Sequence, residues 1–423
     1  MLLEKIRTCW NVRSLLALIL LIVVVGVPRI TFADEVTDWN ATATSAAAAV
    51  GLTGPRHTRV FAMAHAAMHD ALNSIDRRYT PYALDMRADP NASPAAAVAA
   101  AAHDVLVHEI SNQQAFFDAQ YAASLAIIPD GVAKNNGIAV GQAAAAAILA
   151  LRSMDGSTAT VTYIPGTGPG VWQPTPPAFL AANLPGWGSV TPFALRNSSQ
   201  FGPDRPEYFD LTSEEYTTDF NEVKIIGAVN SSIRTAEQSE IARFWYEGSG
   251  LGWNRLARIV SAQQGLDLWQ NARLFGLLNF AMADGFIAGF ETKYLYNFWR
   301  PVTAIRAADA DDNPNTVADV TWSSFLVTPN IPDYTSTHSV LGAAAAEVLA
   351  RFFDDNVIPF TTTSGAPFPG ITRSFTSFSQ AAQENADSRV YAGIHFRTAC
   401  EDGLKQGRKV GKFAVLHFLK KAK

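Results

Sequence analysis

The chain has 423 residues, of which 48% are hydrophobic, and it carries a formal net charge of −5. This hydrophobic content is ample for a large buried core and excludes a disordered protein. A pI near 5.9 leaves no basic surface that could neutralise a run of phosphates, so we expect no nucleic-acid partner.

The first 33 residues have the composition of a secretory signal peptide. Three basic residues precede an apolar run over 15–27, and small residues lead up to Ala33. We therefore expect 1–33 to be a signal peptide, the protein to be secreted or periplasmic, and the mature chain to be free of the membrane. An uncleaved anchor is the alternative, because the run is close to the shortest spanning length. No other stretch is expected to span a bilayer.

Apolar residues recur every three or four positions along most of the remaining chain, which is typical of amphipathic helices. Alanine-rich runs favour helix further, since alanine loses no side-chain entropy there. The ranges expected to be helical are 57–75, 94–110, 114–127, 137–151, 212–229, 235–246, 253–298 with a break near Gly265 or Gly285, 339–353, and the chain after 373.

Two stretches interrupt these helices. The segment 163–206 is rich in proline and glycine, yet its aromatic residues predict an ordered loop. The segment 307–332 is polar and contains proline. We expect an all-α fold of two packed helical bundles, with 34–423 as a single unit and the functional motifs in about 250–423.

Two segments place cations at suggestive spacings. Lys293 and Arg300 are seven residues apart, which on one helix places them on the same face, and Pro301 predicts that Arg300 lies at a helix end. Arg389 precedes His395 by six residues, so we expect either that Arg389 precedes a helix or that Gly393 bends the chain. Each pair taken alone is typical of a solvated face or a helix cap.

A third segment, Thr335-Ser336-Thr337-His338, directly precedes an apolar helix. Serine and threonine are natural N-caps, and the free N–H groups at a helix start bind oxyanions. Helix capping alone would explain the serine and threonine residues of this segment, but it would not explain a histidine placed where an anion would bind.

The ordered set Lys-x6-Arg-Pro, Ser-x-His and Ser-Arg-x5-His resembles the signature shared by vanadium-dependent haloperoxidases, type 2 phosphatidic acid phosphatases and class A acid phosphatases. It covers about 100 residues, from Lys293 to His395. The residues 297–306, around Arg300, and the large helical N-terminal part are more similar to the haloperoxidases.

The resemblance implies a pocket for vanadate, or for phosphate in the same place. Its expected ligands are Lys293, Arg300, Ser336, the N–H of Thr337, Arg389 and His395. His395 would bind vanadium through a ring nitrogen or act as the nucleophile of a phosphatase, and His338 would be the acid–base group.

In the haloperoxidase interpretation, vanadate acts as a Lewis acid on hydrogen peroxide, and halide is oxidised to hypohalous acid, which halogenates small organic acceptors. One alternative is a soluble phosphomonoesterase that hydrolyses phosphate esters through a phosphohistidine. A second is a degenerate homologue that binds phosphate without turnover. The halide and the oligomeric state are left open.

Two positions depart from the family pattern. Thr337 stands where the family usually has glycine, and it is expected to crowd the pocket or to change the backbone angle. Ala399 stands where many members have an aspartate that orients the second histidine, which leaves Asp402 as a more distant candidate.

Overall fold

The computed structural model describes residues 34–52 and 54–422, which belong to one compact unit. The expected signal peptide lies outside the described residues. The expected all-α fold of helical bundles is confirmed, because the described chain is mainly helical. The α-helices are α1 Glu35–Ala49, α2 Gly54–Ile75, α3 Pro94–Glu109, α4 Gln114–Ala126, α5 Val132–Arg152, α6 Glu214–Ile226, α7 Ala236–Phe244, α8 Ser249–Gln264, α9 Leu268–Tyr296, α10 Pro301–Arg306, α11 Thr337–Phe353, α12 Phe378–Tyr391 and α13 Arg397–His417.

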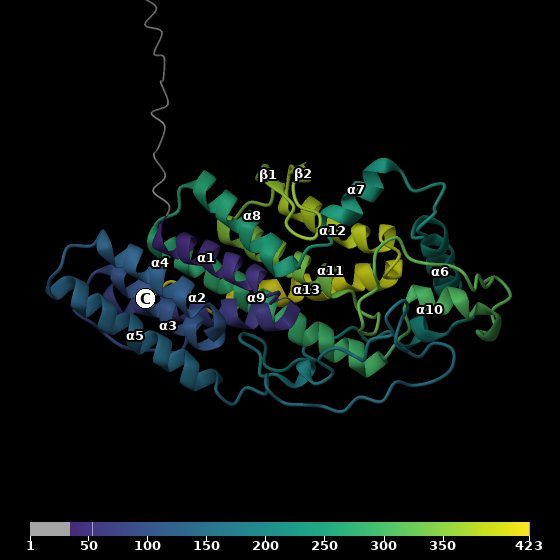
Figure 1. Cartoon of the computed structure of the whole chain (residues 1–423), viewed down its shortest axis with the longest axis horizontal. Coiled ribbons are helices and arrows are strands. Elements are labelled where there is room, and N and C mark those ends of the chain that lie inside the picture. Colours follow the sequence, from purple (N-terminus) through teal and green to yellow (C-terminus); the bar gives the residue numbers. More distant parts are fainter. Residues whose placement is uncertain (1–33, 53, 423) are drawn as a thin grey trace, which may run out of the picture. The chain divides into compact units, whose positions relative to one another are not determined.

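The helices form two groups that share α9. In the first group, α2, α3 and α5 pack on one another and α2 also packs on α9. In the second, α11 packs on α12, α13 and α9. Figure 1 shows α2, α3 and α5 at one end of the described part, α6, α7 and α10 at the other, and α9, α11 and α13 between them.

The helix α9 forms the centre of the core. Its side chains from Leu274 to Phe290 are all buried, and a capping box of Asp267 and Gln270 fixes its start. Contrary to the expectation that no further stretch could span a bilayer, α9 is long and apolar enough to do so. However, 94% of its apolar window is buried inside the protein, as in the core helix of a globular fold.

The break expected in 253–298 occurs at Gly265, which has a φ of +64° between α8 and α9. A glycine tolerates this left-handed conformation, so it ends α8 at low cost. Gly285 lies inside α9, where the helix continues without interruption.

Several elements differ from expectation. The helices α1 and α10 were not expected, and the loop before Arg373 contains an antiparallel hairpin of β1 Phe360–Thr363 and β2 Thr372–Phe375. The hairpin forms because a run of β-branched threonines favours extended backbone, and threonine hydroxyls bond across it. The short 3₁₀ helices are η1 Ser111–Gln113, η2 Trp187–Ser189, η3 Pro206–Phe209 and η4 Ala308–Ala310.

The segment 163–206 is ordered, as its aromatic residues predicted. Trp172, Trp187 and Phe193 are buried, whereas Phe179 is exposed. The buried carboxylate of Asp284 on α9 accepts backbone N–H bonds from Phe193, Ala194 and Leu195 at 2.6–2.7 Å. This segment is therefore anchored to the core helix.

Three glycines four residues apart bring α13 close to α11. A Cβ at Gly403 would lie 2.8 Å from the Ser336 carbonyl oxygen, and one at Gly407 would overlap the Val340 carbonyl oxygen. Gly411 approaches the Ala344 carbonyl in the same way. The absence of side chains on this stripe lets the two backbones touch and fixes the position of the α11 N-terminus.

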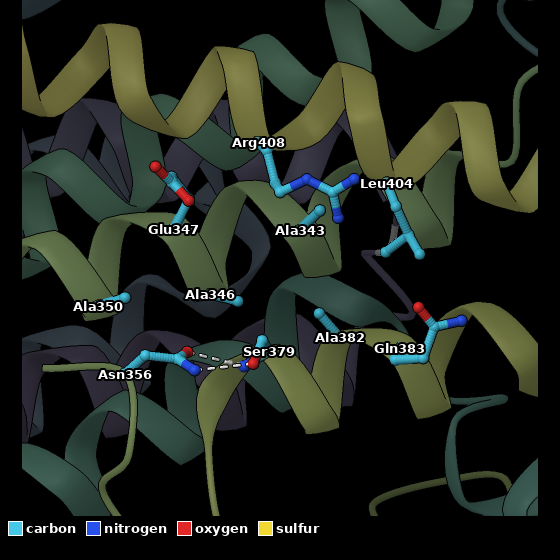
Figure 2. A pocket seen from close by; sticks show the side chains of 10 residues that line it. All are labelled: Ala343, Ala346, Glu347, Ala350, Asn356, Ser379, Ala382, Gln383, Leu404 and Arg408. Carbon is cyan, nitrogen blue, oxygen red and sulfur yellow. Dashed lines mark hydrogen bonds between the residues drawn. The ribbon is translucent and has the colours of Figure 1, made fainter.

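Small side chains also leave a pocket among α11, α12 and α13 (Figure 2). Its floor includes Ala343, Ala346 and Ala382, and Arg408 extends across one side. None of the residues expected to bind an oxyanion lines this pocket.

We predict that Gly407→Ala lowers the free energy of unfolding by about 1–3 kcal/mol, because a methyl group there cannot avoid a backbone carbonyl. Chemical denaturation measures the change. The control is Lys409→Ala on the exposed side of α13, which should change stability by less than about 0.5 kcal/mol. Equal stability of the two variants would contradict the close packing.

Candidate active site

The expected site residues come from four helices and the loop after α12. Lys293 lies in the last turn of α9, Arg300 is the N-cap of α10, and Arg389 lies in the last turn of α12. His395 follows α12, and the α11 N-terminus supplies Ser336, Thr337 and His338.

Lys293 and Arg300 do not lie on one helix, so the expectation of a shared helix face is wrong. Asn297 ends α9 with a φ of +52°, and the chain then runs extended to Arg300. The 163–206 segment pairs with this link, since Trp172 N–H donates to Asn297 O and Trp299 N–H donates to Gly170 O. The position of Arg300 at a helix end agrees with the prediction from Pro301.

The side chains of Lys293 and Arg300 nevertheless meet at the segment before α11. Lys293 Nζ donates to the carbonyl oxygens of Pro332 and Asp333 at 2.8 and 2.6 Å. Arg300 Nε donates to Ile331 O at 2.7 Å. Three consecutive carbonyls therefore hold both cations in place.

Arg300 also reaches the segment that carries Arg389 and His395. Its Nη1 donates to Ile394 O at 2.6 Å and lies 2.9 Å from His395 Nε2. Gly393, with a φ of +76°, bends the chain between Arg389 and His395, which is the second of the two arrangements expected. The backbone of Gly393 packs directly against Gly227, where a side chain on either residue would clash.

Three cations are buried here with one carboxylate near them. Lys293, Arg300 and Arg389 are at most 1% exposed, and burial lowers the pKa of each arginine to about 10, so both stay charged at neutral pH. Within the described residues their one ion pair is Arg300 with Asp333, at 3.8 Å. Burial also lowers the pKa of Lys293 well below its usual value and raises the pKa of Asp333 to about 7. With Lys293 protonated and Asp333 ionised, three positive charges against one negative charge leave an excess of two.

Two guanidinium atoms of this cluster have no hydrogen-bond partner among the described residues, namely Arg300 Nη2 and Arg389 Nε. Buried N–H groups without a partner are costly, and they indicate a missing acceptor. A tetrahedral oxyanion supplies both the acceptors and the negative charge. The residues present therefore fit vanadate or phosphate.

Burial and the positive charges of Arg300, Lys293 and Arg389 lower the pKa of His395 well below its usual value. The ring is therefore neutral at pH 7 and keeps a lone pair on one nitrogen. Its Nδ1 contacts the carboxylate of Asp333, a residue to which the sequence analysis gave no role. An aspartate three residues before Ser336 was the available signal, but the sequence contained nothing to link it with His395.

His338 is partly exposed, unlike the other members of the site. Burial of its ring and the nearby charge of Arg389 lower its pKa well below the usual value, so it is neutral. Its Nε2 lies 3.3 Å from the Glu247 carbonyl oxygen. A carbonyl oxygen can only accept, so Nε2 carries the proton and Nδ1 can accept one.

Ser336 is the N-cap of α11, and its Oγ accepts the Ser339 N–H at 3.4 Å, which leaves the hydroxyl hydrogen available for a ligand. The methyl group of Thr337 does not crowd the anion site. Its Cγ2 lies against Gly289 on α9, where a Cβ would approach to 2.8 Å. The glycine on α9 makes room for the threonine on α11.

Comparisons with known proteins show which proteins the chain resembles. The family model described as "VCPO second helical-bundle domain" matches residues 273–423. Vanadium chloroperoxidase from Curvularia inaequalis is 25% identical over 287 residues, which cover 52% of this chain and 46% of that protein. The chain thus matches less than half the length of this curated relative.

Solved structures extend the likeness to almost the whole chain. A crystal structure of a bacterial vanadium-dependent iodoperoxidase superposes with a TM-score of 0.80 and 28% identity, and the match covers 92% of this chain and 98% of that one. The family model, the curated relative and this structure together support the vanadium haloperoxidase superfamily for this chain. A bacterial vanadium-dependent chloroperoxidase in its holo form shares the fold, with a TM-score of 0.71, 18% identity and coverage of 86% and 92%.

Thr337 and Ala399 are the two positions at which a departure from the family pattern was expected, and the structure shows what surrounds each of them. Gly289 accommodates Thr337, and the Ala399 carbonyl accepts the Ser336 N–H at 2.9 Å. Asp402 does not reach His395, because it accepts from Tyr334 OH and Lys405 Nζ.

We predict that Gly289→Ala costs about 1–3 kcal/mol of stability, because the new methyl group meets Thr337 Cγ2. The double variant Gly289→Ala with Thr337→Ser lacks that Cγ2 and should recover most of the loss. A double-mutant cycle on unfolding free energies measures the coupling. Additive effects would show that the two groups do not meet.

We also predict that Arg389→Met weakens phosphate binding at least about 10-fold without lowering stability, because it removes a buried charge that lacks a carboxylate partner. Titration calorimetry and thermal unfolding measure the two effects. Arg408→Met, on the α13 surface, is the control and should change neither. A destabilised Arg389→Met that still binds phosphate would contradict the assigned role.

Proposed function

We propose that the protein is a vanadate-dependent haloperoxidase, which oxidises halide with hydrogen peroxide to hypohalous acid. The observation that carries the proposal is the buried excess of positive charge, with two partnerless guanidinium nitrogens beside a neutral histidine. The similarity to haloperoxidases over nearly the whole fold favours this reaction over phosphate-ester hydrolysis.

The cations would hold the oxyanion. Lys293, Arg300 and Arg389 neutralise the negative charge of its oxygens. Arg300 Nη2 and Arg389 Nε have no hydrogen-bond partner among the described residues, and both would donate to the anion. The α11 N-terminus adds the Thr337 N–H and the Ser336 hydroxyl. When bound, vanadate supplies a Lewis acid that polarises the O–O bond of hydrogen peroxide.

The two histidines would have separate tasks. His395 offers Nε2 to the central atom of the oxyanion, because its Nδ1 is engaged by Asp333. Arg300 Nη1, which lies 2.9 Å from Nε2, would donate to an oxygen of the anion instead. His338 lies on the more exposed side, and its Nδ1 accepts the proton that hydrogen peroxide gives up. Hypohalous acid would then halogenate small organic acceptors.

Halogenation of a dimedone-type acceptor by the purified protein, with and without added vanadate, tests the reaction. We expect turnover that requires vanadate, hydrogen peroxide and a halide, with chloride, bromide and iodide assayed separately. His395→Ala should fall to the vanadate-free rate. The control is His417→Ala, which changes an exposed histidine at the end of α13 and should keep full activity.

Two other results would replace the proposal. Absence of halogenation together with phosphate-ester hydrolysis that vanadate inhibits would assign a phosphomonoesterase. Absence of both activities, with phosphate still bound, would assign a homologue that no longer catalyses a reaction.

A further inference from the structure

We propose that Asp333 is a positioning residue that fixes the tautomer and the ring orientation of His395 for the oxyanion. The inference rests on the proposed oxyanion site. It concerns a residue in the segment before α11, outside the helix that follows His395.

The two ring nitrogens of His395 have partners of opposite kinds. Arg300 Nη1 lies 2.9 Å from Nε2, and a guanidinium can only donate, so Nε2 presents its lone pair. The remaining proton of the neutral ring is then on Nδ1. There it meets the carboxylate of Asp333, which accepts it. Both contacts therefore select the same tautomer.

Asp333 is itself held rigidly. It is fully buried, and its Oδ2 accepts the Phe396 N–H at 3.4 Å, next to His395 in sequence. Its backbone N–H donates to Phe298 O at 2.9 Å, and its carbonyl oxygen accepts from Lys293 Nζ. The backbone of Asp333 is thus tied to the segment that carries Lys293, and its carboxylate is tied to the segment that carries His395.

The other candidates for this task do not reach the ring. Ala399 has no polar side chain, and the Oδ2 of Asp402 accepts from Tyr334 OH at 2.8 Å. Asp402 also pairs with Lys405 at 2.9 Å and with Arg205 at 3.4 Å. Among the described residues, Asp333 is the carboxylate in contact with His395.

If Asp333 acted through its charge alone, its removal would strengthen anion binding. If Asp333 positions His395, its removal would weaken the binding of vanadate. Removing a carboxylate from a cationic site strengthens the binding of any anion by charge alone. Loss of the preference for the Nδ1-protonated tautomer weakens the binding only of an oxyanion whose central atom bonds to Nε2. Vanadate would form such a bond, and inorganic phosphate would not. The ratio of vanadate to phosphate affinity therefore reports positioning.

The test compares Asp333→Ala, Asp333→Asn and Asp402→Asn with the wild-type protein. Titration with orthovanadate and with inorganic phosphate gives the affinity ratio. Nitrogen NMR of ¹⁵N-histidine-labelled protein gives the tautomer of His395 without any ligand, and a His395→Gln sample identifies its signals.

In the wild-type protein we expect His395 to carry its proton on Nδ1. Asp333→Ala should lose this preference and lower the affinity ratio about 10- to 100-fold, as orienting partners of metal-binding histidines do. Asp333→Asn retains an acceptor oxygen and should keep the tautomer, with a smaller loss. Asp402→Asn should match the wild type in both measurements.

A wild-type His395 protonated on Nε2 would overturn the proposal, as would an Asp333→Ala variant with an unchanged tautomer and ratio. If Asp333→Ala does not fold, an unchanged affinity ratio in Asp333→Asn or a change of tautomer in Asp402→Asn would overturn it. Wild-type protein that binds vanadate no more tightly than phosphate would refute the proposed function. The NMR comparison would still decide the role of Asp333.

Discussion

The structure depends on a buried excess of positive charge. Lys293, Arg300 and Arg389 are almost fully buried around His395, with Asp333 as the one carboxylate in the described part of the cluster. Burying like charges costs free energy unless acceptors surround them. Here the carbonyl oxygens of 331–333 and 394 and of Trp245 supply part of that stabilisation. The N–H groups left over are the basis for binding an anion.

Close backbone contacts keep this cluster in place. The glycine stripe on α13 lets α11 approach, which sets the position of Ser336 and His338. The Gly227–Gly393 contact fixes the bend before His395. Packed cores resist deformation, so cations that repel one another can be held at short range. The large apolar core therefore supports a polar site that is unfavourable in itself.

The same charges determine the protonation of the histidines. Burial and neighbouring cations keep His395 and His338 neutral, which leaves lone pairs for a central atom and for a proton. Asp333 and Arg300 distinguish the two nitrogens of His395, while the Glu247 carbonyl distinguishes those of His338. Two residues of the same type thus acquire different chemical tasks from their hydrogen-bond partners.

The sequence by itself determined the helical fold and the set of cations and histidines. Helical periodicity is local, and the ordered motifs from Lys293 to His395 are visible as residue types and spacings. Proline at 301 and glycine at 393 also predicted how the chain departs from helix near Arg300 and His395.

Only the tertiary structure decided which groups meet. The left-handed turn at Asn297 separates Lys293 and Arg300 onto different helices, and the threonine-rich hairpin is stabilised by pairing across its strands. The contacts of Asp333 with His395 and of Gly289 with Thr337 join residues that lie far apart in the sequence. Such partners are set by the packing of α9, α11 and the chain after α12, which no local pattern encodes.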